Sequence, residues 1–240
     1  MQSDVTHLTL QDQVLTWFEK NKRQLLFGTV ALAVIGTVVG IYLWRQNQTQ
    51  VEASEALSKA ASSAMVAGAP GASTEALLKV AADYAGTDAA KRAVLLAAGN
   101  YFTDGNYPLA QAQFEKFLRD YRESAFVGQA LLGVAACKDA QGKTDEAITA
   151  YKDIVDHHST ESVAPQARFA LGRLYEKQNK PELARDLYLQ VAQMDQNGAL
   201  GAEAGMRMAE LNAKYPSLVT AKPATVSPSG MPVPKPVAKP

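Results

Sequence analysis

Three segments of the sequence repeat one pattern: Asp104–Phe114 (DGNYPLAQAQF), Gln141–Tyr151 (QGKTDEAITAY) and Gln178–Tyr188 (QNKPELARDLY). Equivalent positions lie 37 residues apart in all three segments. Each segment has a glycine or asparagine, an alanine five residues later, and an aromatic residue four residues after that alanine. A fixed period of this length is typical of repeat proteins, in which one helical unit stacks on the next.

Each unit predicts two antiparallel helices joined by a short turn. The glycine or asparagine tolerates the left-handed backbone that ends a helix. Pro108 and Pro181 suit the first turn of the helix that follows. The alanine lets the two helices cross closely, and the aromatic residue lies on the same face. Because one hairpin cannot bury its apolar stripe, we expect the units to stack into an all-α solenoid.

These residues resemble the tetratricopeptide repeat, whose pattern combines Leu-Gly, Tyr, Ala and a second aromatic residue. The third unit matches best, through Leu171, Gly172, Tyr175, Ala184 and Tyr188. In the first and second units, Ala97-Ala98 and Val134-Ala135 replace Leu-Gly. The resemblance implies about three full helix-turn-helix repeats with degenerate units on either side.

The flanks of the repeats define the rest of the chain. Thr74–Tyr84 is predicted to be a second helix whose first helix is Val51–Val66, and Ala199–Tyr215 a closing helix. Beyond Tyr215, proline and small residues dominate, which is typical of disordered or polyproline II segments. We therefore predict four parts: an N-terminal segment, a membrane helix, a repeat domain and a proline-rich tail, at residues 1–24, 25–44, 45–215 and 216–240.

A transmembrane helix is predicted at Leu25–Trp44. These residues carry no charge, and at ~1.5 Å per residue they span ~30 Å, the thickness of a hydrocarbon core. A buried core helix is seldom apolar on all faces. A cleaved signal peptide has a shorter apolar region and small residues at its cleavage site, whereas Trp44-Arg45-Gln46-Asn47 follows here.

The flanking charges predict the orientation of this helix. Lys20, Lys22 and Arg23 precede it, and only Arg45 follows closely. The positive-inside rule then places the N-terminus in the cytoplasm and the repeats on the other side. Gly36 and Gly40 form a GxxxG step that would allow two membrane helices to dimerise.

A short amphipathic helix is predicted at Leu10–Lys22, just before the membrane helix. Leu10, Val14, Trp17 and Phe18 recur at helical spacing. Two interpretations stay open: a separate interfacial or docking helix on the cytoplasmic side, or a simple extension of the membrane helix.

Composition and motifs argue against several functions. Lys and Arg total 24, as do Asp and Glu, so the surplus of cations expected of a general nucleic-acid binder is absent. The chain contains no P-loop, HExxH, GxSxG or CxxC pattern. We interpret His157-His158 as favourable charges at a helix end and Cys137 as a core residue. The sequence therefore predicts no enzyme, cofactor or metal site.

A protein-binding groove is the functional site that the repeat resemblance implies. In tetratricopeptide domains the first helix of each unit lines a concave surface. Transferred to this chain, the candidate partner residues are Arg92, Leu95, Gly99, Gln129, Leu132, Ala136, Gln166, Phe169, Arg173 and Lys177. This mixture of apolar and polar residues suggests extended segments or a partner's helix as the ligand.

The order of segments also resembles the YfgM-type ancillary subunits of the SecYEG translocon. The resemblance rests on Asp12–Gly28 (DQVLTWFEKNKRQLLFG), the glycine-containing apolar stretch and Trp44-Arg45. It implies a single-pass protein of the bacterial inner membrane whose periplasmic repeats bind translocon components, a periplasmic chaperone or emerging polypeptides. The alternative is an envelope-assembly or cell-division scaffold resembling the coordinator of the Tol–Pal system, which is usually soluble in the periplasm after cleavage of a signal.

Overall fold

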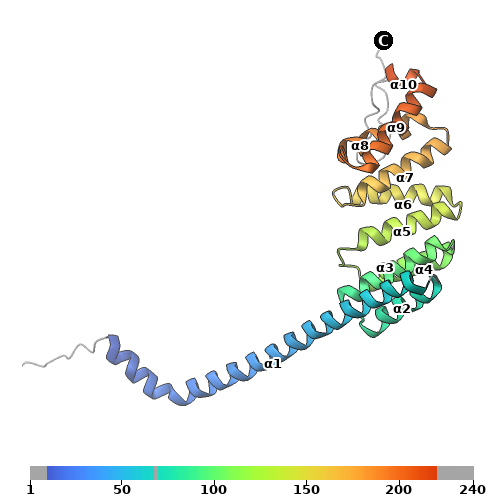
Figure 1. Ribbon diagram of the computed structural model, residues 1–240. Coiled ribbons are helices and arrows are strands. Elements are labelled where there is room, and N and C mark those ends of the chain that lie inside the picture. Colours follow the sequence, from blue (N-terminus) through green and yellow to red (C-terminus); the bar gives the residue numbers. More distant parts are fainter. Residues whose placement is uncertain (1–9, 68–69, 221–240) are drawn as a thin grey trace, which may run out of the picture. The chain divides into compact units, whose positions relative to one another are not determined.

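The computed structural model describes residues 10–67 and 70–220, which form α-helices joined by turns (Figure 1). The helices are α1 (Leu10–Ala67), α2 (Pro70–Asp83), α3 (Asp88–Thr103), α4 (Tyr107–Asp120), α5 (Val127–Ala140), α6 (Thr144–His157), α7 (Ala164–Lys177), α8 (Pro181–Met194), α9 (Ala199–Lys214) and α10 (Ser217–Thr220). The all-α repeat architecture expected from the sequence is confirmed.

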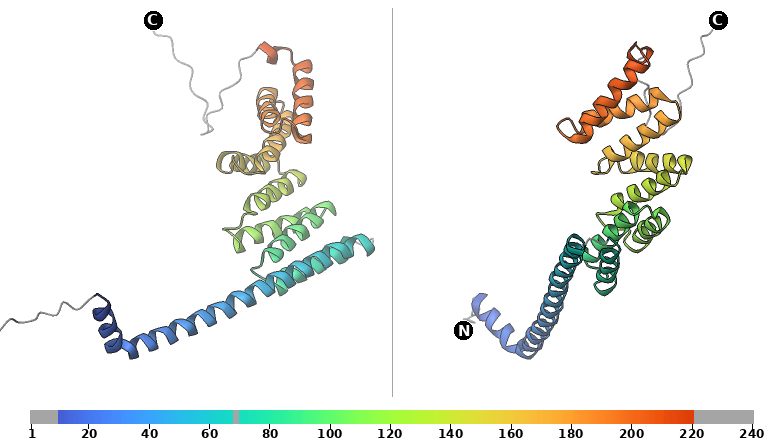
Figure 2. Two further views of the ribbon diagram at one scale, coloured as in Figure 1. Left: turned by 60° about the vertical axis from the view of Figure 1, so that its left-hand side comes forward. Right: turned by 45° about the vertical axis from the view of Figure 1, so that its right-hand side comes forward.

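The chain separates into two compact units, Met1–Glu52 and Ala53–Pro240. The first unit holds the N-terminal part of α1. The second unit holds the end of α1 and the helices α2 to α10. Within the second unit the helices pack in chain order, each against the helices next to it in sequence, as Figure 2 shows. This order is the stacking that a solenoid of helical hairpins requires.

Left-handed residues end the first helix of each full repeat. Gly105 and Gly142 both have φ of 76°, and Asn179 has φ of 57°. These are the positions that the 37-residue period singled out. The second helices α4 and α8 then begin with Pro108 in the first turn and Pro181 at the first residue. The turn chemistry predicted from the sequence therefore sets the hairpins.

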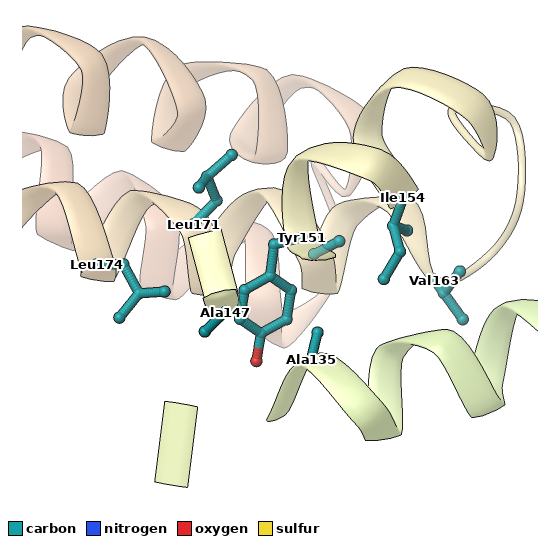
Figure 3. Packing of buried hydrophobic residues seen from close by; sticks show 8 residues of the cluster. Ala135, Ala147, Tyr151, Ile154, Val163, Leu171 and Leu174 are labelled. Atoms are coloured by element: carbon teal, nitrogen blue, oxygen red, sulfur yellow. The ribbon is translucent and has the colours of Figure 1, made fainter. Parts of the chain in front are cut away.

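Alanine and aromatic residues form the helix crossings inside each unit. Ala110, Ala147 and Ala184 are fully buried. Four residues later come buried aromatic side chains, and three residues after those come three more buried residues, Phe117, Ile154 and Val191. Figure 3 shows the middle cluster, where Tyr151 of α6 lies near Ala135 of α5. The core is thus a row of similar clusters.

The N-terminal end of the repeat domain is built from the last turns of α1. Ala60 packs in one cluster with Leu77 and Val80 of α2 and with Ala93 and Ala97 of α3. Leu77 and Val80 lie 37 residues before Phe114 and Phe117. Residues 53–67 therefore act as the first helix of a unit that precedes the three full repeats.

The C-terminal end holds the first helix of a further unit. Tyr215 follows α9 in the position that Gln141 and Gln178 hold after α5 and α7. The next position is the left-handed one, and here it is Pro216. Because proline fixes φ near −65°, it cannot adopt the left-handed backbone that opens the other hairpins. The second helix, α10, is four residues long, and Arg185 of α8 donates a hydrogen bond to the Leu218 carbonyl.

The N-terminal part of α1 carries the apolar stretch. Lys20–Ser62 is a helical region long and apolar enough to cross a membrane, with a mean hydropathy of 2.2 in its most apolar window and none of that window buried. Leu32 is 70% exposed and Phe27 is 71% exposed. The predicted interfacial helix at Leu10–Lys22 continues into the same α1 without a break; most of its side chains lie outside the described residues.

Candidate protein-binding surface

The predicted partner residues lie on the first helices of the three full repeats. We call this surface the first-helix face and define it by α3, α5 and α7. Five of its residues are exposed: Arg92, Gln129, Gln166, Arg173 and Lys177. Four are half-buried: Leu95, Gly99, Leu132 and Ala136. The face therefore presents polar ends over a partly apolar floor.

Phe169 is a core residue and leaves the candidate surface. Its side chain is 7% exposed, and its ring centroid lies 5.4 Å from that of Tyr188. The transferred repeat pattern placed it on the face with the equivalent residues Leu95 and Leu132, which are smaller and half-buried. A phenylalanine at this position reaches the second helix of its own unit, so it packs inward.

Asp139 organises the charges of this face. Its carboxylate lies 3.5 Å from Nη2 of Arg173 and 3.7 Å from Nζ of Lys177. Asp139 is on α5 and both cations are on α7, so the pairs bridge two neighbouring units. Only 14% of the Asp139 side chain is exposed, whereas Arg173 and Lys177 are 45% and 63% exposed. The cations can therefore contact a ligand while the carboxylate holds them in place.

Sequence reasoning missed Asp139. The period contained a usable signal, since Glu176 occupies the equivalent position in the next unit. Glu176 accepts a hydrogen bond of 2.8 Å from the Tyr188 hydroxyl. A carboxylate near the end of a first helix and a tyrosine on the following helix thus recur together. The pairing of Asp139 with Arg173 depends on the angle between units, which no single repeat encodes.

The tyrosines below the face are held in their neutral form. Burial is the largest cause that raises the pKa of Tyr151, and the nearby Asp139 carboxylate raises this pKa further. Burial, followed by the hydrogen bond to Glu176, raises the pKa of Tyr188. Arg173 lies near both hydroxyl groups and acts in the opposite direction. The two hydroxyl groups are therefore uncharged at neutral pH, and the charged groups at this end of the face are Asp139 and its partners Arg173 and Lys177.

Arg92 is held on the first unit by an aromatic ring. Its guanidinium carbon lies 5.4 Å from the centroid of Phe126, a distance at which a cation and a ring attract each other. Phe126 immediately precedes α5, so this contact also bridges two units. Arg92 is thus oriented by a residue of the next repeat, and Arg173 by a residue of the previous repeat.

The groups considered for chemistry lie in the core or at the end of a helix. Cys137 is fully buried in the first core cluster, and burial raises the pKa of its thiol to about 11. His157, at the end of α6, lies 2.9 Å from the Asp153 carboxylate, and His158 contacts Glu161. Among the described residues no three His, Cys, Asp or Glu side chains gather as a metal site.

The apolar part of α1 is the second candidate surface. A Cβ atom built on Gly36 or Gly40 meets no other atom within 4 Å. Thr37 donates its hydroxyl to the Ala33 carbonyl at 2.8 Å, so its polar group is satisfied within the helix. Gly36 and Gly40 thus have open space beside them in the single chain, and the Thr37 hydroxyl between them has an intrahelical partner.

Comparisons with known proteins agree on the repeat domain. A family model described as a tetratricopeptide repeat-like domain matches residues 16–153, and one described as a tetratricopeptide repeat matches residues 138–199. No curated protein matches the chain.

Solved structures of other repeat proteins are similar to this chain in fold. A tetratricopeptide repeat protein from Parabacteroides merdae has 12% identity and a TM-score of 0.52, and the match covers 72% of this chain and 66% of that one. A Podosopora anserina putative kinesin light chain with nearly identical repeats has 15% identity and a TM-score of 0.50, with 73% and 90% covered. The chain thus spans just under two thirds of the length of the Parabacteroides protein.

Proposed function

We propose, on the premise that this chain belongs to the tetratricopeptide repeat-like domain family, that it is a membrane-anchored scaffold that binds other proteins on its repeats. The observation that carries the proposal is the first-helix face. It combines exposed cations held from neighbouring units with a neutral, half-buried floor. Such a surface suits an extended segment or an amphipathic helix with acidic groups at its edge.

We propose further that α1 anchors the scaffold in the inner membrane of a bacterium through residues 25–44. The N-terminus would lie in the cytoplasm and the repeat domain in the periplasm. The support is the charge asymmetry around the apolar stretch and the exposure of its large side chains. Gly36 and Gly40 would let two such helices pair.

The proposed partners are components of the protein-export translocon, a periplasmic chaperone or emerging polypeptides. The support is the resemblance of the N-terminal segments to translocon-associated subunits. An envelope-assembly or cell-division scaffold is the alternative, and it uses the same face for a different partner. No catalytic step is part of either proposal.

Photo-crosslinking from matched exposed positions tests the proposal. A photoreactive amino acid replaces Gln129 or Gln166, which are exposed on the first-helix face. As controls, it replaces Gln193, an exposed glutamine of the second helix α8, or Ala112, an exposed residue of the second helix α4. We expect crosslinks to an export component or chaperone from Gln129 and Gln166 only.

The other outcomes are equally specific. Capture of an envelope-assembly protein from the face would favour the alternative partner. Equal capture from the face and from the control positions would contradict a binding role for the first-helix face. A reporter fused at Pro240 that is active only in the cytoplasm would contradict the proposed orientation.

A further inference from the structure

The first helix of the last unit, α9, carries an apolar stripe that is exposed among the residues that the structure describes. The stripe consists of Ala202, Met206, Ala209 and Ala213, which are spaced three or four residues apart and therefore share one side of the helix. All four residues are exposed, and Met206 is 62% exposed. We call this surface the α9 stripe.

The equivalent stripe of α7 is covered by a single tyrosine from the following helix. The residues 37 positions earlier are Pro165, Phe169, Gly172 and Glu176. The Tyr188 ring of α8 packs against Phe169, and a Cβ atom on Gly172 would lie 2.8 Å from that ring. The Tyr188 hydroxyl bonds Glu176. One aromatic side chain thus contacts three of the four residues.

The two other full repeats cover the same position. Ala98 and Ala135 are equivalent to Ala209, and both are fully buried. Each belongs to a core cluster that contains the aromatic residue of its own second helix, Phe114 or Tyr151. In the three full repeats this position is therefore buried, whereas Ala209 is exposed.

The segment that follows α9 accounts for the exposure of the α9 stripe. The second helix that would cover the stripe is α10, which ends at Thr220. The position equivalent to Tyr188 is Thr225, outside the described residues, and residues 216–240 contain no aromatic residue. Residues 216–240 therefore contain no side chain of the kind that covers the equivalent stripes of α3, α5 and α7.

The residue near the end of each first helix determines whether the aromatic residue that covers the stripe is a tyrosine or a phenylalanine. Tyr188 lies above Glu176, and Tyr151 lies near Asp139, so each hydroxyl meets a carboxylate. In the first unit Phe102 occupies the carboxylate position, and the covering residue is Phe114, which has no hydroxyl. A buried hydroxyl without a partner is costly. At α9 this position is Ala213, which favours phenylalanine.

We propose that the α9 stripe is a docking site for an amphipathic helix of another protein, with a phenylalanine of that helix seated over Ala209. The occupant continues the core packing of the three full repeats and takes the place of the missing second helix. Its small residue, four positions before the phenylalanine, would face α9 as Ala110 and Ala184 face α3 and α7. This site is separate from the first-helix face and requires no membrane.

A peptide from the chain's own α4 provides the probe. Residues 106–121 contain Ala110 and Phe114 at the required spacing. Fluorescence anisotropy of the labelled peptide is measured against the full chain in detergent. We expect binding, about tenfold weaker binding when the peptide carries Phe114→Tyr, and loss of binding with Phe114→Ala. Equal affinity of the phenylalanine and tyrosine peptides would overturn the proposal.

Two alanines of the full chain provide a matched pair of variants. Ala209→Arg blocks the stripe, and Ala82→Arg changes another exposed alanine, on α2. We expect Ala209→Arg to abolish peptide binding and Ala82→Arg to leave it unchanged, with equal thermal unfolding of both variants. Peptide binding that survives Ala209→Arg would show that the peptide binds elsewhere, which overturns the site.

Two further measurements exclude occupants from the chain itself. Removal of residues 221–240 should leave the peptide affinity unchanged; a tenfold gain would identify the tail as the occupant and overturn the proposal. Sedimentation of the full chain should be the same for Ala209→Arg and Ala82→Arg. A dimer lost only in Ala209→Arg would identify a second copy as the occupant, with the same consequence. Crosslinking from Gln129 and Gln166 is independent of all these results.

Discussion

Individual backbone positions decide where each hairpin of this molecule turns. Gly105, Gly142 and Asn179 adopt left-handed conformations at intervals of 37 residues. In the next interval the position is Pro216, and the regular hairpin stops there. A substitution at one of these positions therefore acts through φ, with little effect from lost contacts.

Gly142→Ala should destabilise the repeat domain. The left-handed conformation costs a residue with a Cβ atom about 1 kcal/mol or more, although no atom lies within 4 Å of the added methyl group. Gly205→Ala is the matched control, because Gly205 is helical, and an added Cβ again meets no atom within 4 Å. That variant should gain about 0.5–1 kcal/mol. Denaturant unfolding measures both; loss in both variants would contradict the argument.

Cys137 should make stability fall at alkaline pH. Burial raises the pKa of its thiol to about 11 in the folded chain, above the value of about 8.5 for an exposed thiol. The folded chain therefore holds this proton more tightly, so the contribution is complete below about pH 8.5 and is lost as the pH rises toward 11.

The measurement is denaturant unfolding at neutral pH and at about pH 10, between the two pKa values. The wild-type chain should be less stable at the higher pH. Cys137→Ala should reduce this difference, because the variant has no thiol to ionise. Tyr151 and Tyr188 contribute in the same direction, so part of the difference should persist. An unchanged difference in the variant would show that the thiol is not involved.

At the scale of helices, the molecule pairs each aromatic of a second helix with a residue near the end of the first. Tyr188 pairs with Glu176 through a hydrogen bond of 2.8 Å, and Tyr151 lies near Asp139. Phe114 shares its cluster with Phe102 instead. The three units therefore use two versions of one crossing, a polar version and an apolar version.

Phe114→Tyr should destabilise the first full repeat by about 1–3 kcal/mol, because its hydroxyl would be buried beside Phe102 without a carboxylate. The double variant Phe114→Tyr, Phe102→Glu should recover part of this loss by recreating the polar version. A double-mutant cycle on the free energy of unfolding measures the coupling between the two positions. Purely additive effects would show that the pairing carries no energy.

The first-helix face gives a second test at this scale. Asp139→Asn removes the charge that holds Arg173 and Lys177. We expect partner crosslinking from Gln166 to fall several-fold, while thermal unfolding changes little, because partly exposed ion pairs contribute about 0–1 kcal/mol. Glu182→Gln, at an exposed residue of the second helix α8, is the control for a simple loss of a negative charge. Equal effects of both variants would show that Asp139 makes no specific contribution to partner binding.

The helices and the turns could be predicted from the sequence because each repeat encodes them locally. The spacing of Ala147 and Tyr151 fixes the crossing, and Gly142 fixes the turn. The charges of the first-helix face could not be predicted in the same way. Asp139 meets Arg173 across two units, and Phe169 turns into the core because its size lets it reach Tyr188. Both depend on the geometry between helices.

For the whole chain, charge is divided among the segments. Residues 45–215 carry 18 cations and 21 acids, a net charge of −3, and the tail carries Lys222, Lys235 and Lys239 with no acid, a net charge of +3. Residues 25–44 carry no charge. The overall charge of zero therefore does not describe the charge of any one segment. We propose that the uncharged residues 25–44 anchor the chain in the membrane.

The full chain should stay in the membrane after alkaline carbonate extraction and be released by detergent. Val34→Lys with Val38→Lys places two charges in the centre of the apolar stretch, where both side chains are more than half exposed. Each lysine costs about 2.5–3.5 kcal/mol at the centre of a membrane helix. We expect this variant to appear in the soluble fraction. Gln46→Lys with Gln48→Lys, outside the stretch, should remain with the membrane.

The packing of helices only against their near neighbours has a consequence for how the chain acquires its structure. The helices that pack together are close in sequence, so the contact order is low. Folding can therefore advance one hairpin at a time. The end of α1 can serve as the template against which α2 and α3 first pack. A chain delivered from its N-terminus could thus fold progressively while its last residues were still being synthesised.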